Sequence, residues 1–295
     1  MKQKNKSNIF RPAKNKIIVV LGPTASGKSD LAIKIAKEFN GEIISADSRQ
    51  VYKGLDIGTG KVPRDKAKNY YYKGIKHYLL DIASPKRKFT AFQYQKLAKK
   101  AIEKILSKGK IPIICGGTAF YIYSVIYNWQ FPQVPPNYKL RKQLEEKTSE
   151  ELFTQLKDLD PQRAKNIDKN NKRRLIRALE IVLTIKKPNP QKLVLNQKNS
   201  TFEVLKIGVK KSDEELKNLI KIRLEKRLKQ GMIKEVKNLH QQGLSWKRLD
   251  ELGLEYRYIS YYLRGLLTKE KMIEILNQKI WQFSKRQMNW FKKDK

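Results

Sequence analysis

An eight-residue glycine-rich loop near the start of the chain has the composition of a phosphate-binding site. Residues 22–29 read Gly-Pro-Thr-Ala-Ser-Gly-Lys-Ser and match the pattern G-x-x-x-x-G-K-[ST] without a gap. Gly22 and Gly27 let the backbone turn so that successive N–H groups face an anion, and the following helix adds its positive end. Lys28 supplies a positive charge, and Ser29 is a candidate Mg²⁺ ligand. Because the loop lies between an apolar run and a helical pattern, we expect it to bind a phosphorylated ligand.

The sequence lacks one residue that ATP hydrolysis usually needs. P-loop NTPases hold Mg²⁺ partly through an aspartate at the end of a neighbouring strand. The candidate strand, residues 111–115, ends instead in Gly116, Gly117 and Thr118. This difference argues against ordinary ATP hydrolysis, although Asp81, which follows two leucines, could replace the missing aspartate.

A carboxylate follows the second apolar run. Asp47 comes directly after residues 42–46, which we expect to form a strand. Ligands of open α/β sheets bind at the carboxyl ends of the strands, so Asp47 and the glycine-rich loop should line one crevice. An aspartate at this place can act as a base, or it can simply cap a helix or turn.

The elements around these residues predict a parallel α/β sheet. Apolar runs at 17–21, 42–46 and 111–115 have the length of buried strands, and helical spacing occupies 28–39 and 91–106. Strands alternating with helices are typical of an open parallel sheet flanked by helices. We therefore predict a P-loop NTPase-like fold.

The composition changes after Trp129. Residues 131–136 hold three prolines, residues 140–185 have a charged helical pattern, and residues 186–200 form a second Pro/Asn/Gln-rich break. A strand is expected at 202–209, followed by long helices at 213–242 and 269–291. We predict a basic disordered tail at 1–15, a catalytic core made of 16–130 and 201–295, and a helical insertion at 131–200.

The charge indicates a polyanionic partner. The chain has 65 Lys and Arg against 28 Asp and Glu, a formal net charge of +37. Solvated lysines can account for part of this excess, but RNA or DNA is the first choice of partner. The single cysteine, Cys115, excludes a disulfide or a multi-cysteine zinc site. Without a membrane span or a secretory signal, we expect a cytoplasmic protein.

Cations and tyrosines that could contact a nucleic acid are grouped in the sequence. Lys172, Arg173, Arg174 and Arg177 place several positive charges on one helical turn, which favours phosphate contact over a merely solvated face. Candidates for stacking on a base extruded from its loop are the tyrosines at 70–72, 256, 258, 261 and 262.

Several segments together resemble one enzyme family. The run GPTASGKS, then ISADSRQVYKGLDIGTGK, then PIICGGTAFY is similar to the tRNA dimethylallyltransferases. The resemblance continues in RLIRALE at 174–180 and SKRQ at 284–287, so it covers nearly the whole chain from residue 17. The segment beginning at Asp47 is its most specific part, because generic P-loop kinases do not carry it.

The resemblance implies a fold, a reaction and a set of site residues. The fold is a P-loop core with an inserted helical tRNA-binding domain. The reaction transfers a dimethylallyl group from its diphosphate to N6 of adenosine 37, in tRNAs that read codons starting with U, with Mg²⁺ as cofactor and the protein acting as a monomer. Carried over position by position, the catalytic residues are Asp47 as general base, Thr118 and Arg227. The diphosphate-binding residues are Gly22, Pro23, Thr24, Ala25, Ser26, Gly27, Lys28 and Ser29, and the tRNA-contacting residues are Asp47, Ser48, Arg49, Gln50, Thr118, Arg141, Arg173, Arg174 and Arg177. Many relatives have Gly-Tyr-Arg or Gly-Tyr-Lys where this chain has Gly-Leu-Glu-Tyr-Arg at 253–257, and so the resemblance assigns no tRNA contact over 248–257.

Three other functions stay open at this point. A small P-loop kinase would explain the glycine-rich loop but not the missing aspartate or the arginine cluster. An isopentenyltransferase acting on free adenylate would explain the core but not the insertion and the charge. A basic RNA-binding protein without activity would not explain why Asp47 stands opposite an intact Lys28.

Overall fold

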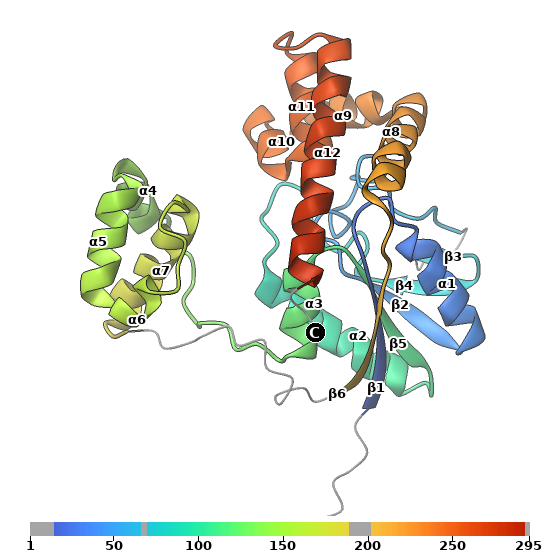
Figure 1. The fold of residues 1–295 in the computed structure, drawn as a ribbon, viewed down its shortest axis with the longest axis horizontal. Coiled ribbons are helices and arrows are strands. Elements are labelled where there is room, and N and C mark those ends of the chain that lie inside the picture. The colour runs from blue at the N-terminus through green and yellow to red at the C-terminus, as the bar shows by residue number, and fades with distance from the viewer. Residues whose placement is uncertain (1–14, 66–69, 189–201, 293–295) are drawn as a thin grey trace, which may run out of the picture. The chain divides into compact units, whose positions relative to one another are not determined.

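The computed structural model describes residues 15–65, 70–188 and 202–292. The chain forms two compact units, of which the first comprises Met1–Asn128 and Asn196–Lys295 and the second is Trp129–Leu195 (Figure 1). Almost all of the tail predicted at 1–15 and most of the break predicted at 186–200 lie outside the described residues.

A six-stranded sheet in the order β3-β4-β2-β5-β1-β6 forms the centre of the first unit. β1 pairs in parallel with β5 and β6, β2 pairs in parallel with β4 and β5, and β3 pairs antiparallel with β4. The predicted P-loop-like, mostly parallel sheet is thus confirmed, whereas the two short strands β3 and β4 were not predicted. The strands are β1 (Asn15–Leu21), β2 (Gly41–Ser45), β3 (Tyr71–Tyr72), β4 (Ile75–Tyr78), β5 (Ile111–Gly116) and β6 (Phe202–Gly208).

Helices cover both faces of this sheet because its central strands are apolar on both sides. Successive side chains of a strand point to opposite faces, and Ile18 and Val20 of β1 pack with Ala32 and Ile33 of α1 (Lys28–Glu38). Figure 1 shows α2 (Ala91–Leu106) and α3 (Ala119–Ile126) on the other side of the sheet. Both faces are therefore buried, and the carboxyl ends of the strands are left to form a site.

Five helices at the end of the chain stand over those carboxyl ends (Figure 1). They are α8 (Asp213–Lys229), α9 (Met232–Gln241), α10 (Trp246–Leu252), α11 (Leu254–Leu263) and α12 (Lys269–Phe291). The helical content predicted over 213–242 is divided into two helices, because α8 ends at Lys229 and Gly231, with a φ of 98°, is the N-cap of α9. The helix predicted at 269–291 is confirmed.

The described residues of the second unit, 129–188, form helices and no strand, in agreement with the predicted fold class. This unit contains α4 (Tyr138–Glu146), α5 (Ser149–Leu159), α6 (Pro161–Ala164) and α7 (Lys172–Ile185). Its own apolar core includes Leu144, Leu152, Leu156 and Leu179, and Thr148 begins α5 in a capping box with Glu151. None of the helices described in either unit is long and apolar enough to cross a membrane.

Candidate active site

The glycine-rich loop joins β1 to α1 through a glycine in the left-handed conformation. Gly27 has a φ of 85°, which favours glycine, and α1 begins at Lys28. A Cβ atom on Gly22 would lie 2.9 Å from the carbonyl oxygen of Val209, so a larger residue would push the loop off β6. The ammonium of Lys28 donates to the carbonyl of Pro23 at 3.0 Å within the loop. The loop backbone is thus held in place by its glycines and by its neighbouring strand.

A cavity of about 480 Å³ opens beside this loop. Segments far apart in the sequence line it: the glycine-rich loop, the ends of β2 and β5, residues 58–60, and helices α8, α11 and α12. The residues predicted for catalysis and diphosphate binding that reach this cavity are Thr24, Lys28, Ser29, Asp47, Thr118 and Arg227, together with Ser48, Arg49 and Gln50 from the predicted tRNA contacts. The structure therefore brings two carboxylates, those of Asp47 and Glu255, and a cluster of cationic side chains into a single site.

Asp47 is positioned by the turn that follows β2. Its Oδ1 atom accepts the backbone N–H groups of Arg49 and Gln50 at 2.8 and 3.3 Å. Within the described part of the chain, Oδ2 has no hydrogen-bond partner, so this oxygen can accept a proton from a ligand. The capping role that we considered for Asp47 and a role as base are thus compatible, because each uses a different oxygen.

Thr118 connects this turn to the end of β5. Its Oγ1 atom accepts the N–H of Ser48 at 3.1 Å, and its own N–H donates to the carbonyl of Ala46 at 3.1 Å. A Cβ atom on Gly116 would lie 2.2 Å from that same carbonyl, so the two strand ends approach closely only because residue 116 is glycine. Thr118 therefore fixes the turn that carries Asp47.

The side chain of Arg227, on α8, lines the cavity. Its Nη1 atom donates to the carbonyl of Gly58 and to Glu255, both at 3.2 Å. A Cβ atom on Gly60 would lie 1.8 Å from Nη2, so the guanidinium passes where any other residue would place a side chain. Burial raises the pKa of Glu255, and the nearby charge of Arg227 opposes that effect.

Two further residues hold the glycine-rich loop from the helical side, and sequence reasoning assigned a role to neither. Arg223 lies one helical turn before Arg227 and donates from Nη2 to the hydroxyl of Thr24 at 2.8 Å. Gln287 of α12 accepts the N–H of Thr24 at 2.8 Å and donates to the carbonyl of Gly117 at 2.9 Å. The spacing of Arg223 to Arg227 was the signal for the first, because residues four apart share a helix face. For Gln287, the sequence offered only its position in the SKRQ segment, which belongs to the family resemblance.

The site is strongly cationic. Burial lowers the pKa of Lys28, and the positive charges of Arg223 and Arg227 lower it further. Burial and then Arg227 also lower the pKa of Arg223. Positive charges that repel one another in this way favour the binding of an anion, because a bound diphosphate would compensate all three charges.

The predicted tRNA-contacting residues fall into two groups. Within the first unit, the side-chain amide of Gln50 donates to the carbonyls of Thr59 and Gly60 at 3.2 and 3.3 Å and accepts the hydroxyl of Ser45 at 3.0 Å. Gln50 thus joins two loops of the cavity wall, while Arg49 lines the cavity.

The remaining arginines belong to the second unit. Arg141 and Arg177 both bind the fully buried carboxylate of Glu180, at 2.7 and 2.5 Å. Arg177 of the predicted phosphate-contacting cluster is therefore paired with an acid that lies just beyond the run of cations. Arg173 and Arg174 are exposed on α7 and form no ion pair with any residue that the structure describes.

Two other expectations are corrected. Asp81, considered as a replacement Mg²⁺ ligand, is not part of the cavity wall and instead binds Lys61 and, at 2.7 Å, Arg64. Tyr256, considered for base stacking, is 1% exposed, and its hydroxyl donates to Glu235 at 2.8 Å. Tyr258 lines the cavity and stays available for stacking.

The chain is similar to known proteins over most of its length. The family model described as IPP transferase matches residues 50–294. A tRNA dimethylallyltransferase of Acetivibrio thermocellus is 43% identical over 282 residues, covering 94% of this chain and 88% of that protein. A second, of Anoxybacillus flavithermus, is 42% identical and covers 94% of this chain and 87% of that protein.

Solved structures resemble the chain over nearly its whole length. The tRNA isopentenylpyrophosphate transferase of Staphylococcus epidermidis is 38% identical with a TM-score of 0.68, covering 95% of this chain and 90% of that one. A eukaryotic dimethylallyltransferase acting on tRNA is 29% identical with a TM-score of 0.77, covering 94% of this chain and 69% of that one. From its sequence and its fold alike, this chain belongs to the IPP transferase family.

Proposed function

We propose that this protein transfers a dimethylallyl group from dimethylallyl diphosphate to N6 of adenosine 37 in tRNAs that read codons starting with U. The products are N6-(dimethylallyl)adenosine in the tRNA and free diphosphate. The observation that carries the proposal is the convergence of the Asp47 carboxylate with Lys28, Arg223 and Arg227 in one cavity. The names of the relatives, which are tRNA dimethylallyltransferases, support the same reaction.

Asp47 would act as the general base. The exocyclic amine of adenine is a weak nucleophile because its lone pair is delocalised into the ring. As N6 forms a bond to C1 of the dimethylallyl group, the nitrogen loses a proton, which Oδ2 of Asp47 accepts. A base in this position typically contributes about 10²–10⁴-fold to the rate.

The cations of the cavity would stabilise the leaving group. The bond between C1 and the diphosphate oxygen breaks as the new bond forms, and its electron pair leaves with the diphosphate. We propose that loop N–H groups and the cations Lys28, Arg223 and Arg227, which line the cavity, bind that developing charge. The allylic carbon tolerates positive charge, so positioning of the two substrates supplies much of the remaining acceleration.

The residues of the cavity fit a Mg²⁺ ion that is held mainly by the substrate. No cluster of three acidic, histidine or cysteine residues occurs among the residues that the structure describes. Mg²⁺ commonly binds one or two protein groups together with substrate phosphates, and the Ser29 side chain lines the cavity at the start of α1. Ser29 would hold the ion, which would add positive charge beside the diphosphate.

The tRNA would be bound by the charge of the protein and by the cavity. The net charge of +37 favours a polyanion, and Arg173 and Arg174 present exposed charges on α7. Adenosine 37 must leave its stack to reach Asp47, which costs a few kcal/mol and less from a loop than from a duplex. We propose that the protein acts as a monomer in the cytoplasm, where its substrate tRNA is found.

A transfer assay tests this proposal. The protein is incubated with labelled dimethylallyl diphosphate, Mg²⁺ and an unmodified tRNA whose anticodon loop contains A36-A37-A38, and the matched control is the same tRNA with guanosine at position 37. We expect label in the first tRNA and none in the control. Absence of transfer, together with ATP turnover on a small acceptor, would support the kinase alternative instead.

A further inference from the structure

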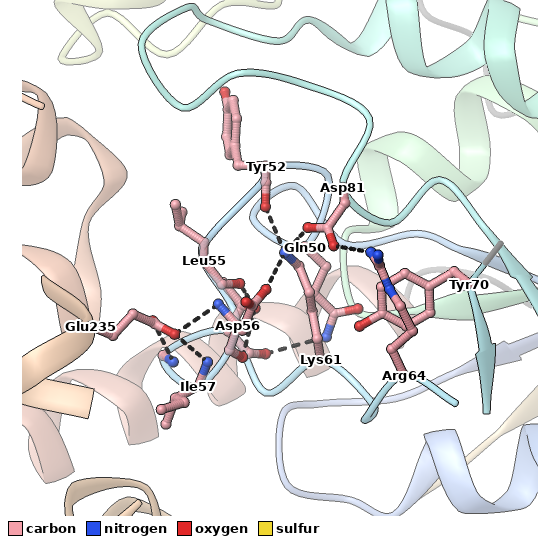
Figure 2. Close-up of polar contacts among 12 residues, drawn as sticks. Gln50, Tyr52, Leu55, Asp56, Ile57, Lys61, Arg64, Tyr70, Asp81 and Glu235 are labelled. Carbon is pink, nitrogen blue, oxygen red and sulfur yellow. Dashed lines mark hydrogen bonds and ion pairs between the residues drawn. The ribbon is translucent and has the colours of Figure 1, made fainter. Parts of the chain in front are cut away.

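A short loop of the cavity wall, residues 55–60, is held from two sides (Figure 2). It belongs to the segment that most strongly indicated the family, and its residues Gly58, Thr59 and Gly60 line the cavity. Bonds within the loop, from the N–H of Gly60 to the carbonyl of Ile57 at 3.0 Å, fold it tightly. The residues that hold this loop have no part in the reaction proposed above.

On one side, Glu235 of α9 binds three consecutive backbone N–H groups. Its carboxylate accepts the N–H of Asp56 at 3.0 Å, of Ile57 at 2.6 Å and of Gly58 at 3.0 Å. The hydroxyl of the buried Tyr256 donates to the same carboxylate at 2.8 Å. Hydrogen bonds to an ionised acceptor are among the stronger ones in proteins, and four that converge on one carboxylate fix the loop backbone.

On the other side, Lys61 anchors the end of the loop. Its side chain is 1% exposed, and its ammonium donates to the carbonyl of Tyr52 at 2.6 Å and to Asp56 at 2.8 Å, with Asp81 as a third partner (Figure 2). Arg64 binds the other oxygen of Asp81 at 2.7 Å and lies over the ring of Tyr70. A glutamate and a lysine thus fasten the loop from opposite directions.

The loop in turn positions groups that face the substrate. Its Gly58 carbonyl accepts Arg227, and its Gly60 leaves the space through which that guanidinium passes. Its last two carbonyls accept the amide of Gln50, next to the turn that carries Asp47. A shift of residues 56–58 would therefore displace Arg227, because its guanidinium bonds to the Gly58 carbonyl and passes over Gly60.

We infer that Glu235 is a positioning residue for the diphosphate half of the site. It holds residues 56–58 so that Arg227 lies against the leaving diphosphate. The inference rests on the proposed function, and it predicts an effect on diphosphate binding that a merely structural contact would not produce. The predicted tRNA contacts meet this loop through the side-chain amide of Gln50, which bonds to Thr59 and Gly60 and not to residues 56–58, so tRNA binding should change much less than diphosphate binding.

Glu235→Gln tests this inference, because it keeps the shape of the side chain and removes its charge. The matched control is Glu225→Gln, which changes an exposed glutamate of the neighbouring helix α8. Titration calorimetry with inorganic diphosphate, steady-state kinetics and thermal unfolding are measured for both variants. We expect Glu235→Gln to weaken diphosphate binding and raise the KM for dimethylallyl diphosphate by at least about tenfold. The KM for tRNA should stay within about twofold of the wild-type value.

Equal diphosphate affinity in Glu235→Gln and Glu225→Gln would overturn the inference, even if Glu235→Gln unfolds at a lower temperature. If Glu235→Gln does not fold, Tyr256→Phe removes a single donor to the carboxylate and should weaken diphosphate binding about two- to fivefold; unchanged affinity there would also overturn it. A wild-type protein that binds diphosphate but transfers nothing to tRNA would overturn the proposed function itself, and the inference with it.

Discussion

Gln287→Leu should loosen the glycine-rich loop from α12. Gln287 is 6% exposed and joins two loops of the site, because it accepts the N–H of Thr24 at 2.8 Å and donates to the carbonyl of Gly117 at 2.9 Å. Each net hydrogen bond contributes about 1 kcal/mol, and the Gly117 carbonyl left without its donor costs about 1–3 kcal/mol more. Since Thr24 can exchange its lost bond for water, we expect the free energy of unfolding to fall by about 2–4 kcal/mol.

Calorimetric unfolding measures this loss directly. A change of 1 kcal/mol shifts the midpoint by about 2–4 °C in a domain of this size, so the expected fall is roughly 4–16 °C. Diphosphate binding should weaken as well, because the N–H of Thr24 belongs to the loop that binds it. Gln278→Leu, which alters an exposed residue of the same helix, is the control. Equal midpoints and equal diphosphate affinities in the two variants would refute the role assigned to Gln287.

Three further predictions address the reaction and its substrates. Asp47→Asn should lower kcat by about 10²–10⁴-fold while tRNA still binds, and an unchanged kcat would exclude Asp47 as the base. Arg174→Ala should weaken tRNA binding and reduce the slope of log affinity against log salt by about one. Lys157→Ala, at an exposed position of α5, serves as the control. An unchanged slope in Arg174→Ala would mean that the cations of α7 are merely solvated and do not contact phosphate. Because burial lowers the pKa of Lys28 in the free protein, a bound diphosphate should raise that pKa and draw in a proton. Diphosphate affinity should therefore decline as pH rises through the lowered pKa, and calorimetry in buffers of different ionisation enthalpy should detect proton uptake, which Lys28→Met abolishes.

The parts of the fold that sequence periodicity predicts well are those whose burial is regular. The buried strands β1, β2 and β5 are short apolar runs, the helix at 91–106 has a regular amphipathic pattern, and all four occur as expected. The small strands β3 and β4 are short and only half-buried, so they give no clear period. The break between α8 and α9 depends on the φ of Gly231, and a single glycine in a helical pattern does not by itself end a helix.

The sequence predicted the parts of the site that directly follow buried strands. The glycine-rich loop and Asp47 follow strands whose ends meet at one edge of the sheet, and topology alone brings them together. Arg223 and Gln287 could not be assigned from the sequence, because their partners, Thr24 and Gly117, lie more than a hundred residues away. For Arg177 the partner is near in sequence, because Glu180 lies three residues later on the same helix. The run of cations nevertheless drew attention to a nucleic-acid contact, and Glu180 was not recognised as the counter-charge.

The position of the transferred group tests the central claim most directly. After incubation with dimethylallyl diphosphate and an unmodified tRNA, nuclease digestion and mass spectrometry locate the modified nucleotide. The site of Asp47, Lys28 and Arg227 predicts one dimethylallyl group on N6 of adenosine 37, one diphosphate released for each group transferred, and no consumption of ATP. A tRNA that stays unmodified, or a group found at another nucleotide, would contradict the account.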